Sequence, residues 1–198
     1  MSTIHLWPKK YILVVSAMVK IVGIGGSLRP SSLSLQALEI VAERLEAIGA
    51  EVEILDLRTL KLPFCNGGNE YPEYPDVERM QQTVKEADGL ILATPEYHGS
   101  VSGVMKNALD LMSFEHLDGK VAGFISVLGG QSNSNAVNHL RLILRWVHAW
   151  VIPEQIAIGK AWNAFSNDGK ILDERLSERF DKFAQSLVEN TRKIRGCN

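Results

Sequence analysis

The chain has 198 residues, which is enough for one domain with a substantial buried core. Its formal net charge of −2, with 45% hydrophobic and 22% charged residues, is typical of a soluble globular protein and argues against nucleic acid or a membrane surface as a partner. The two cysteines, Cys65 and Cys197, show no C-x-x-C or metal-ligand spacing, which argues against a disulfide framework or a metal site and favours a cytoplasmic location.

The first 17 residues differ from the rest of the chain. Lys9 and Lys10 precede an apolar run over 11–19 that resembles a short signal peptide. However, Lys20 interrupts the run, no clean small-x-small cleavage site follows, and the run is too short to span a bilayer. We therefore expect residues 1–17 to be an N-terminal appendage, or an incorrectly assigned start with Met18 as the true initiator. Residues 18–198 are expected to form a single domain.

Short apolar runs alternate with segments of helical periodicity along the chain. Strands are predicted at 20–24, 52–57, 89–93, 121–127 and 156–158. Helices are predicted at 33–48, 76–87 and 102–112, after the polar loop 129–135 to near residue 150, and at 174–195. The first helix has Ser31, Ser32 or Ser34 as its N-cap. Residues 58–75 are rich in proline and glycine and are predicted to be a long irregular connection.

Alternating strands and helices indicate a parallel sheet that is covered on both faces. The simplest arrangement is an α/β fold of the flavodoxin-like type: a three-layer, doubly wound, five-stranded parallel sheet with strand order 2-1-3-4-5. In such a sheet, ligands bind at the carboxyl ends of the strands, at the switch point between the first and third strands. The loops 25–32 and 94–100 follow these two strands, so we expect them to line the ligand site.

The loop 25–32 has the composition of a phosphate-binding loop. Gly25 and Gly26 permit a sharp turn, and the following helix presents unpaired N–H groups and the positive end of its dipole. Hydroxyl and guanidinium donors are available from Ser27, Ser32, Ser34 and Arg29. The alternative is that the serines only cap the helix and Arg29 is a solvated charge. The loop matches neither G-x-x-x-x-G-K-[ST] nor G-x-G-x-x-G, which argues against a P-loop and a dinucleotide fold.

The loop 94–100 offers backbone groups and the ring of Tyr97 to a flat ligand. Together with a phosphate loop, this combination favours a mononucleotide, and a flavin above the others.

Two segments resemble the NAD(P)H-dependent FMN reductases, a group that includes quinone, azo-dye and chromate reductases. These segments are Gly-Ser-Leu-Arg-Pro-Ser-Ser at 26–32, and Thr-Pro-Glu-Tyr-His-Gly-Ser at 94–100 followed by Gly-Val-Met-Lys-Asn-Ala-Leu-Asp at 103–110. The resemblance implies a flavodoxin-like domain that binds FMN noncovalently and assembles as a homodimer or homotetramer. The sequence departs from the family at His98, where asparagine is common, and at Ser102, where proline is common.

The resemblance also implies the site residues, which fall into three groups. The 5′-phosphate would be held by Ser27, Arg29, Ser32 and Ser34. The isoalloxazine ring would be bordered by Pro95, Glu96, Tyr97, His98 and Gly99. The other side of the pocket would be closed by Ser126, Gly129 and Gly130.

The function that follows is an FMN-dependent NAD(P)H oxidoreductase, with NAD(P)H as co-substrate. Hydride would pass through FMN to quinones, free flavin or another planar acceptor by a ping-pong mechanism. No catalytic side chain is expected, because the flavin itself carries the chemistry. The alternatives are a flavodoxin-type electron carrier, expected to be more acidic with a threonine-rich loop, and a flavin-bound redox sensor without significant turnover.

Four further residues are predicted to lie on the helix that ends near residue 150. His139, Trp146, His148 and Trp150 are expected to lie on a buried face or at a subunit interface rather than against a cofactor.

Overall fold

The computed structural model describes residues 18–131, 134–166 and 168–196. The predicted N-terminal appendage, residues 1–17, lies outside these residues.

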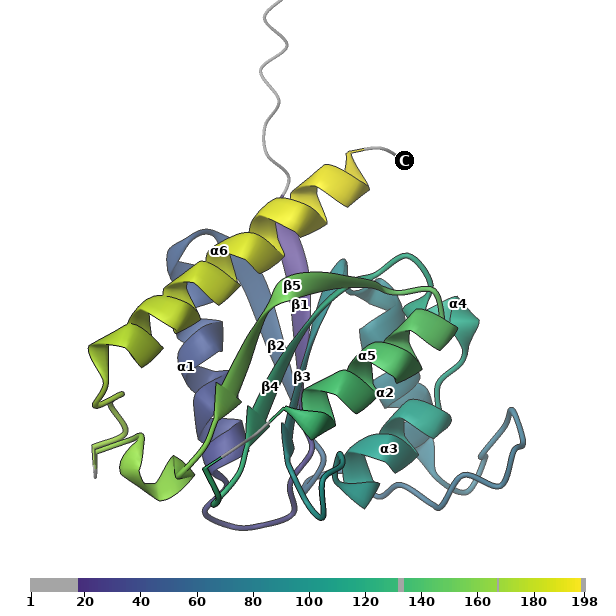
Figure 1. Ribbon diagram of the computed structural model, residues 1–198. Helices are drawn as coiled ribbons and strands as arrows, with labels where there is room; N and C mark the ends of the chain where they lie inside the picture. Colours follow the sequence, from purple (N-terminus) through teal and green to yellow (C-terminus); the bar gives the residue numbers. More distant parts are fainter. Residues whose placement is uncertain (1–17, 132–133, 167, 197–198) are drawn as a thin grey trace, which may run out of the picture.

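Five parallel strands form one sheet in the order β2-β1-β3-β4-β5 (Figure 1). The strands are β1 (Val19–Gly25), β2 (Ala50–Asp56), β3 (Gly89–Pro95), β4 (Val121–Val127) and β5 (Trp150–Ile158). Strand β2 is added on one side of β1, and β3, β4 and β5 are added on the other side. This switch point between β1 and β3 leaves a crevice at the carboxyl ends of these two strands. The predicted flavodoxin-like fold and its strand order are confirmed.

Helices cover both faces of the sheet. They are α1 (Leu33–Ala47), α2 (Pro75–Glu86), α3 (Gly103–Asp110), α4 (Phe114–Leu117), α5 (Asn135–Trp146) and α6 (Glu174–Arg195), with a short 3₁₀ helix η1 (Ala161–Asn163) after β5. Helices α1 and α6 lie on one face, and α2, α3, α4 and α5 lie on the opposite face (Figure 1). Alternate residues of each strand supply the two cores: Ile21 packs toward α1 and α6, whereas Val22 packs toward α2 and α3.

The region around residue 150 differs most from the prediction. Strand β5 begins at Trp150 rather than at 156. Its first half has only one buried residue, Ile152, and includes Pro153, so it gives no apolar run, although an edge strand tolerates this composition. Helix α5 ends at Trp146, since His148 adopts a left-handed backbone with φ 61°. The buried-face expectation is wrong for all four residues: Trp146 and Trp150 are 72% and 64% exposed, and His139 and His148 are also exposed. Of the four, His139 and Trp146 lie on α5, whereas His148 follows it and Trp150 begins β5. The alternative, a subunit interface, stays a prediction.

The loops that follow β1, β3 and β4 lie together at the lower edge of the sheet in Figure 1. The sheet order therefore brings together the two glycine-containing loops that the sequence singled out.

Candidate functional site

A cavity of about 380 Å³ opens at the carboxyl ends of β1, β3 and β4, within the roughly 300–1,000 Å³ range of small-molecule sites. Its walls come from four segments: the loop and helix start after β1, the loop after β3, the end of β4 and the chain after β5. The lining residues are Ser27, Arg29, Ser31, Ser32, Leu33, Ser34, Gln36, Pro95, Glu96, Tyr97, Val127, Leu128, Gly129, Ala161, Trp162, Phe165 and Ser166.

The first wall begins at Gly26, where any larger residue would force neighbouring atoms to move. The Gly26 N–H donates to the Ala93 carbonyl at 2.7 Å, so the chain leaves β1 against the neighbouring strand. A Cβ on Gly26 would lie 2.8 Å from the Cβ of Met105, which is fully buried in α3. The Ser102 hydroxyl donates to the Gly26 carbonyl at 2.5 Å and also caps α3 by accepting from the Met105 N–H. Ser102, which stands where the family commonly has proline, is thus the N-cap of α3.

The N-terminus of α1 presents a row of free donors. The Ser32 hydroxyl accepts from the Leu35 N–H at 3.1 Å and lies 3.0 Å from the Ser34 hydroxyl. Across the described residues, the backbone N–H groups from Ser31 to Ser34 have no protein acceptor. Four successive N–H groups at the positive end of a helix dipole, beside hydroxyls that line a cavity, are suited to an anion such as a phosphate.

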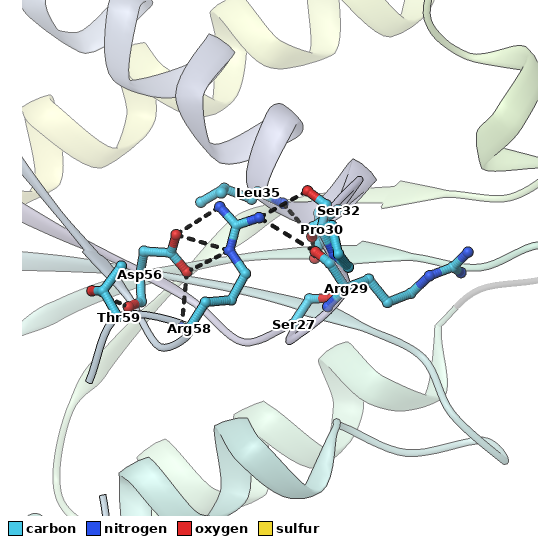
Figure 2. Close-up of polar contacts among 9 residues, drawn as sticks. Ser27, Arg29, Pro30, Ser32, Leu35, Asp56, Arg58 and Thr59 are labelled. Atoms are coloured by element: carbon cyan, nitrogen blue, oxygen red, sulfur yellow. Dashed lines mark hydrogen bonds and ion pairs between the residues drawn. The ribbon is translucent and has the colours of Figure 1, made fainter. Parts of the chain in front are cut away.

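Asp56 and Arg58 lie behind this loop, at the end of β2 (Figure 2). The Arg58 side chain donates to the Asp56 carboxylate, which holds the pKa of that carboxyl below its usual range. The same bond raises the pKa of the Arg58 guanidinium. Asp56 is the only candidate for the ribose-binding carboxylate of a dinucleotide fold, but it lies too far downstream of the first strand. Arg58 also donates to both of its carboxylate oxygens.

The second wall is a tight turn after β3. Tyr97 and Ser100 exchange both backbone hydrogen bonds, at 2.9 and 3.1 Å. The two residues between them, His98 and Gly99, have φ of 50° and 75°. Two consecutive left-handed residues are the geometry of a type I′ turn, in which asparagine and glycine are favoured and histidine is tolerated. The replacement of asparagine by His98 therefore keeps the turn.

The Glu96 carboxylate ties this turn to the loop after β4. Glu96 is only 6% exposed, and its Oε2 accepts from the Ala136 N–H at 3.0 Å, in the first turn of α5. Its Oε1 lies 3.4 Å from the Asn135 side-chain amide. The side chain thus caps α5, while the Glu96 N–H donates to the Val127 carbonyl at 2.8 Å.

The third wall is formed where Trp162 covers Gly129. A Cβ on Gly129 would fall 2.1 Å from the indole ring, so the ring lies directly against the glycine backbone. Trp162 is 67% exposed and faces the cavity together with Phe165. The site therefore has a polar end at α1 and an end that is lined in part by the aromatic rings of Trp162 and Phe165.

The comparisons with known proteins agree with this geometry. A sequence model of the NADPH-dependent FMN reductases matches residues 19–163, which is most of the chain. The chain belongs to this family. It is therefore a flavin-dependent oxidoreductase that uses NAD(P)H.

Individual relatives support the assignment. An NAD(P)H-dependent FMN reductase of Pseudomonas aeruginosa is 35% identical over 90% of this chain and 98% of its own length. The NADPH-dependent FMN reductase ArsH of Shigella flexneri is 32% identical over 89% of this chain and 70% of its own. An FMN-dependent NADPH-azoreductase of Staphylococcus aureus is 33% identical over 82% and 90%. The structure of FerB, a flavoenzyme NAD(P)H:acceptor oxidoreductase from Paracoccus denitrificans, has the same fold, with a TM-score of 0.75, 24% identity, and coverage of 89% of this chain and 98% of that one.

Most of the residues predicted for this FMN reductase from its sequence lie around the cavity. Those that line it are Ser27, Arg29, Ser32, Ser34, Pro95, Glu96, Tyr97 and Gly129. The residues outside the lining are His98 and Gly99, at the tip of the turn, Ser126, fully buried in β4, and Gly130, whose carbonyl accepts from the Lys160 N–H.

Sequence reasoning missed the wall that follows β5. Trp162, Phe165 and Ser166 line the cavity but belong to no motif. Their signal is positional: they come directly after the carboxyl end of a parallel strand, where such sheets bind ligands.

Proposed function

We propose that this FMN reductase binds FMN noncovalently in the cavity at the carboxyl ends of β1, β3 and β4, with its phosphate at the N-terminus of α1. The observation that carries the proposal is the row of free N–H groups from Ser31 to Ser34 beside a cavity that aromatic side chains line in part. Ser27, Ser32, Ser34 and Arg29 add hydroxyl and charged donors to the same end of the cavity. The residues present therefore fit a flavin mononucleotide better than a dinucleotide.

When bound, FMN supplies the redox chemistry: it takes a hydride from the nicotinamide and passes two electrons on. The protein's part is to bind, orient and shield. Pro95, Glu96 and Tyr97 border the ring region, together with Gly129 on the other side. The Glu96 carboxylate fixes two of these walls relative to each other, because it caps α5 while its own N–H is bonded to β4.

The acceptor, we further propose, is a small planar compound such as a quinone, free flavin or an azo dye. NAD(P)H and the acceptor would use the same open side of the cavity in turn, which is a ping-pong mechanism. The partly exposed rings of Tyr97 and Trp162 offer stacking surfaces at that opening. No catalytic acid or base is assigned to the chain.

The first test is an absorption spectrum of the purified protein, followed by anaerobic addition of NADPH or NADH. Flavin bands that bleach within seconds, and parallel double-reciprocal plots with a quinone acceptor, are the expected results. Bands that persist after both nucleotides would favour the electron carrier or the redox sensor instead. Intersecting plots together with rapid bleaching would contradict the ping-pong mechanism but not the flavin reductase activity.

We also propose that the protein acts as a homodimer or homotetramer. Leu142 and Trp146, four residues apart on α5, are 66% and 72% exposed and therefore form an apolar strip on one face of that helix. Light scattering should give a mass at least twice 21.9 kDa, and Trp146→Glu should lower it.

In the part of the chain that the structure covers, no helix has the length and apolar character to cross a membrane.

A further inference from the structure

Arg58 joins the end of β2 to the loop that precedes α1. Its Nε lies 3.0 and 2.9 Å from the two Asp56 carboxylate oxygens, and its Nη2 lies 2.6 Å from one of them. The remaining nitrogen, Nη1, donates to the Pro30 carbonyl at 2.8 Å and lies 3.4 Å from the Arg29 carbonyl. Figure 2 shows the guanidinium between Asp56 on one side and the loop carbonyls on the other.

This bond fixes the direction of a backbone donor. In a trans peptide unit the carbonyl and the following N–H point in opposite directions. Because the Pro30 carbonyl points at Arg58, the Ser31 N–H must point away from Arg58. Ser31 lines the cavity, and its N–H is the first of the four free donors.

The same contact also orients the Arg29 side chain. Its backbone carbonyl faces Arg58, while its side chain extends away from Arg58 (Figure 2) and lines the cavity. Asp56 neutralises the Arg58 charge, so the pair adds no net charge to the loop. The pair instead holds the loop in the conformation in which the Ser31 N–H and the Arg29 side chain face the cavity.

We propose that Arg58, held by Asp56, is a positioning residue for the phosphate of FMN: it preorganises the loop 29–31 without touching the ligand. The inference rests on the proposed binding of FMN in this cavity. Preorganisation lowers the ordering cost of binding, and it acts only on ligands that use the ordered loop. Riboflavin has the same ring as FMN but lacks the phosphate, so it provides an internal reference.

The test is a fluorescence titration of the apoprotein, prepared by removing bound flavin, with FMN and with riboflavin. Arg58→Ala should weaken FMN binding about tenfold and riboflavin binding less than about twofold. Circular dichroism verifies that each variant is folded. Arg44→Ala is the matched control, because Arg44 pairs with Asp181 and Ser177 between α1 and α6, and it should leave the ratio of the two dissociation constants unchanged.

Asp56→Ala separates positioning from a direct charge contact. If Arg58 acted by attracting the phosphate itself, removal of the neutralising carboxylate would tighten FMN binding. The positioning role predicts weaker FMN binding, as in Arg58→Ala, and a double variant no weaker than either single one. Tighter binding in Asp56→Ala, or an unchanged FMN-to-riboflavin ratio in Arg58→Ala, overturns the inference. Wild-type apoprotein that binds FMN no better than riboflavin overturns the proposed phosphate site itself.

Discussion

The substitution Gly26→Ala tests how the loop after β1 is held at its start. The new Cβ would lie 2.8 Å from both the Cβ and the Cε of Met105, and 3.2 Å from the Ala93 carbonyl oxygen. Carbon atoms in favourable contact are about 3.5–4.0 Å apart, so the neighbours would have to move. Met105 is fully buried and the Ala93 carbonyl accepts from the Gly26 N–H, which leaves little room for that movement.

Overpacking of this kind lowers the free energy of unfolding by about 1–3 kcal/mol. For a domain of this size, a loss of about 2 kcal/mol corresponds to a fall of about 4–8 °C in Tm. The assay is urea unfolding followed by circular dichroism, with the midpoint compared at equal slope. The backbone of Gly26 has no positive φ, so the effect comes from the contact and not from backbone strain.

Gly103→Ala is the matched control on the same helix that Gly26 contacts. A Cβ on Gly103 would meet nothing within 4 Å. In a helix, alanine is favoured over glycine by up to about 1 kcal/mol, so this variant should be as stable as wild type or slightly more stable. Equal destabilisation by both substitutions would refute the packing argument, as would a Gly26→Ala variant with an unchanged urea midpoint.

Three further predictions concern side chains around the cavity. Ser32→Ala removes the N-cap of α1 and should lower the free energy of unfolding by about 1 kcal/mol in urea titrations; an unchanged midpoint contradicts it. Glu96→Ala leaves the buried Ala136 N–H without its acceptor and should lower the free energy of unfolding by about 1–3 kcal/mol in the same assay. A decrease below roughly 0.5 kcal/mol, the effect of a surface substitution, would contradict this prediction. Because Arg58 lowers the folded-state pKa of Asp56 below 3.8, the pair stabilises the fold above that pH and ceases to do so as the pH falls through the folded-state pKa. The stability difference between wild type and Asp56→Asn should therefore be constant above about pH 5 and shrink in more acidic buffer; a difference that grows on acidification contradicts this.

The central part of the fold follows from the sequence because its signals are local. Strands β3 and β4 are buried along their whole length, and β1 is buried at every position except Lys20, so all three appear as short, mostly apolar runs. The glycines and serines after β1 mark the turn and the cap of α1, and Ser32 is indeed that cap. The strand order then follows from the rules of doubly wound sheets.

The edge of the fold does not follow in the same way. Strand β5 lies at the edge of the sheet, and the exposed Pro153 and the partly buried Glu154 break its apolar run. The place of Trp162 against Gly129 depends on where β5 ends and how the chain returns toward the cavity, which is a tertiary contact without a local signal. Similarly, nothing in the spacing of Asp56 and Arg58 indicates that Arg58 reaches the loop carbonyls, since the contact joins residues 28 positions apart.

The most direct test of the account is an amide NMR titration of the apoprotein with FMN and, separately, with riboflavin. FMN should produce its largest shifts at the N–H groups of Ser31 to Ser34 and at Glu96 and Tyr97. Riboflavin should shift the second group and leave the first nearly unchanged, since it has no phosphate to accept from α1. If FMN leaves the amides from Ser31 to Ser34 unshifted, or shifts residues away from this cavity, the flavin site described above is wrong.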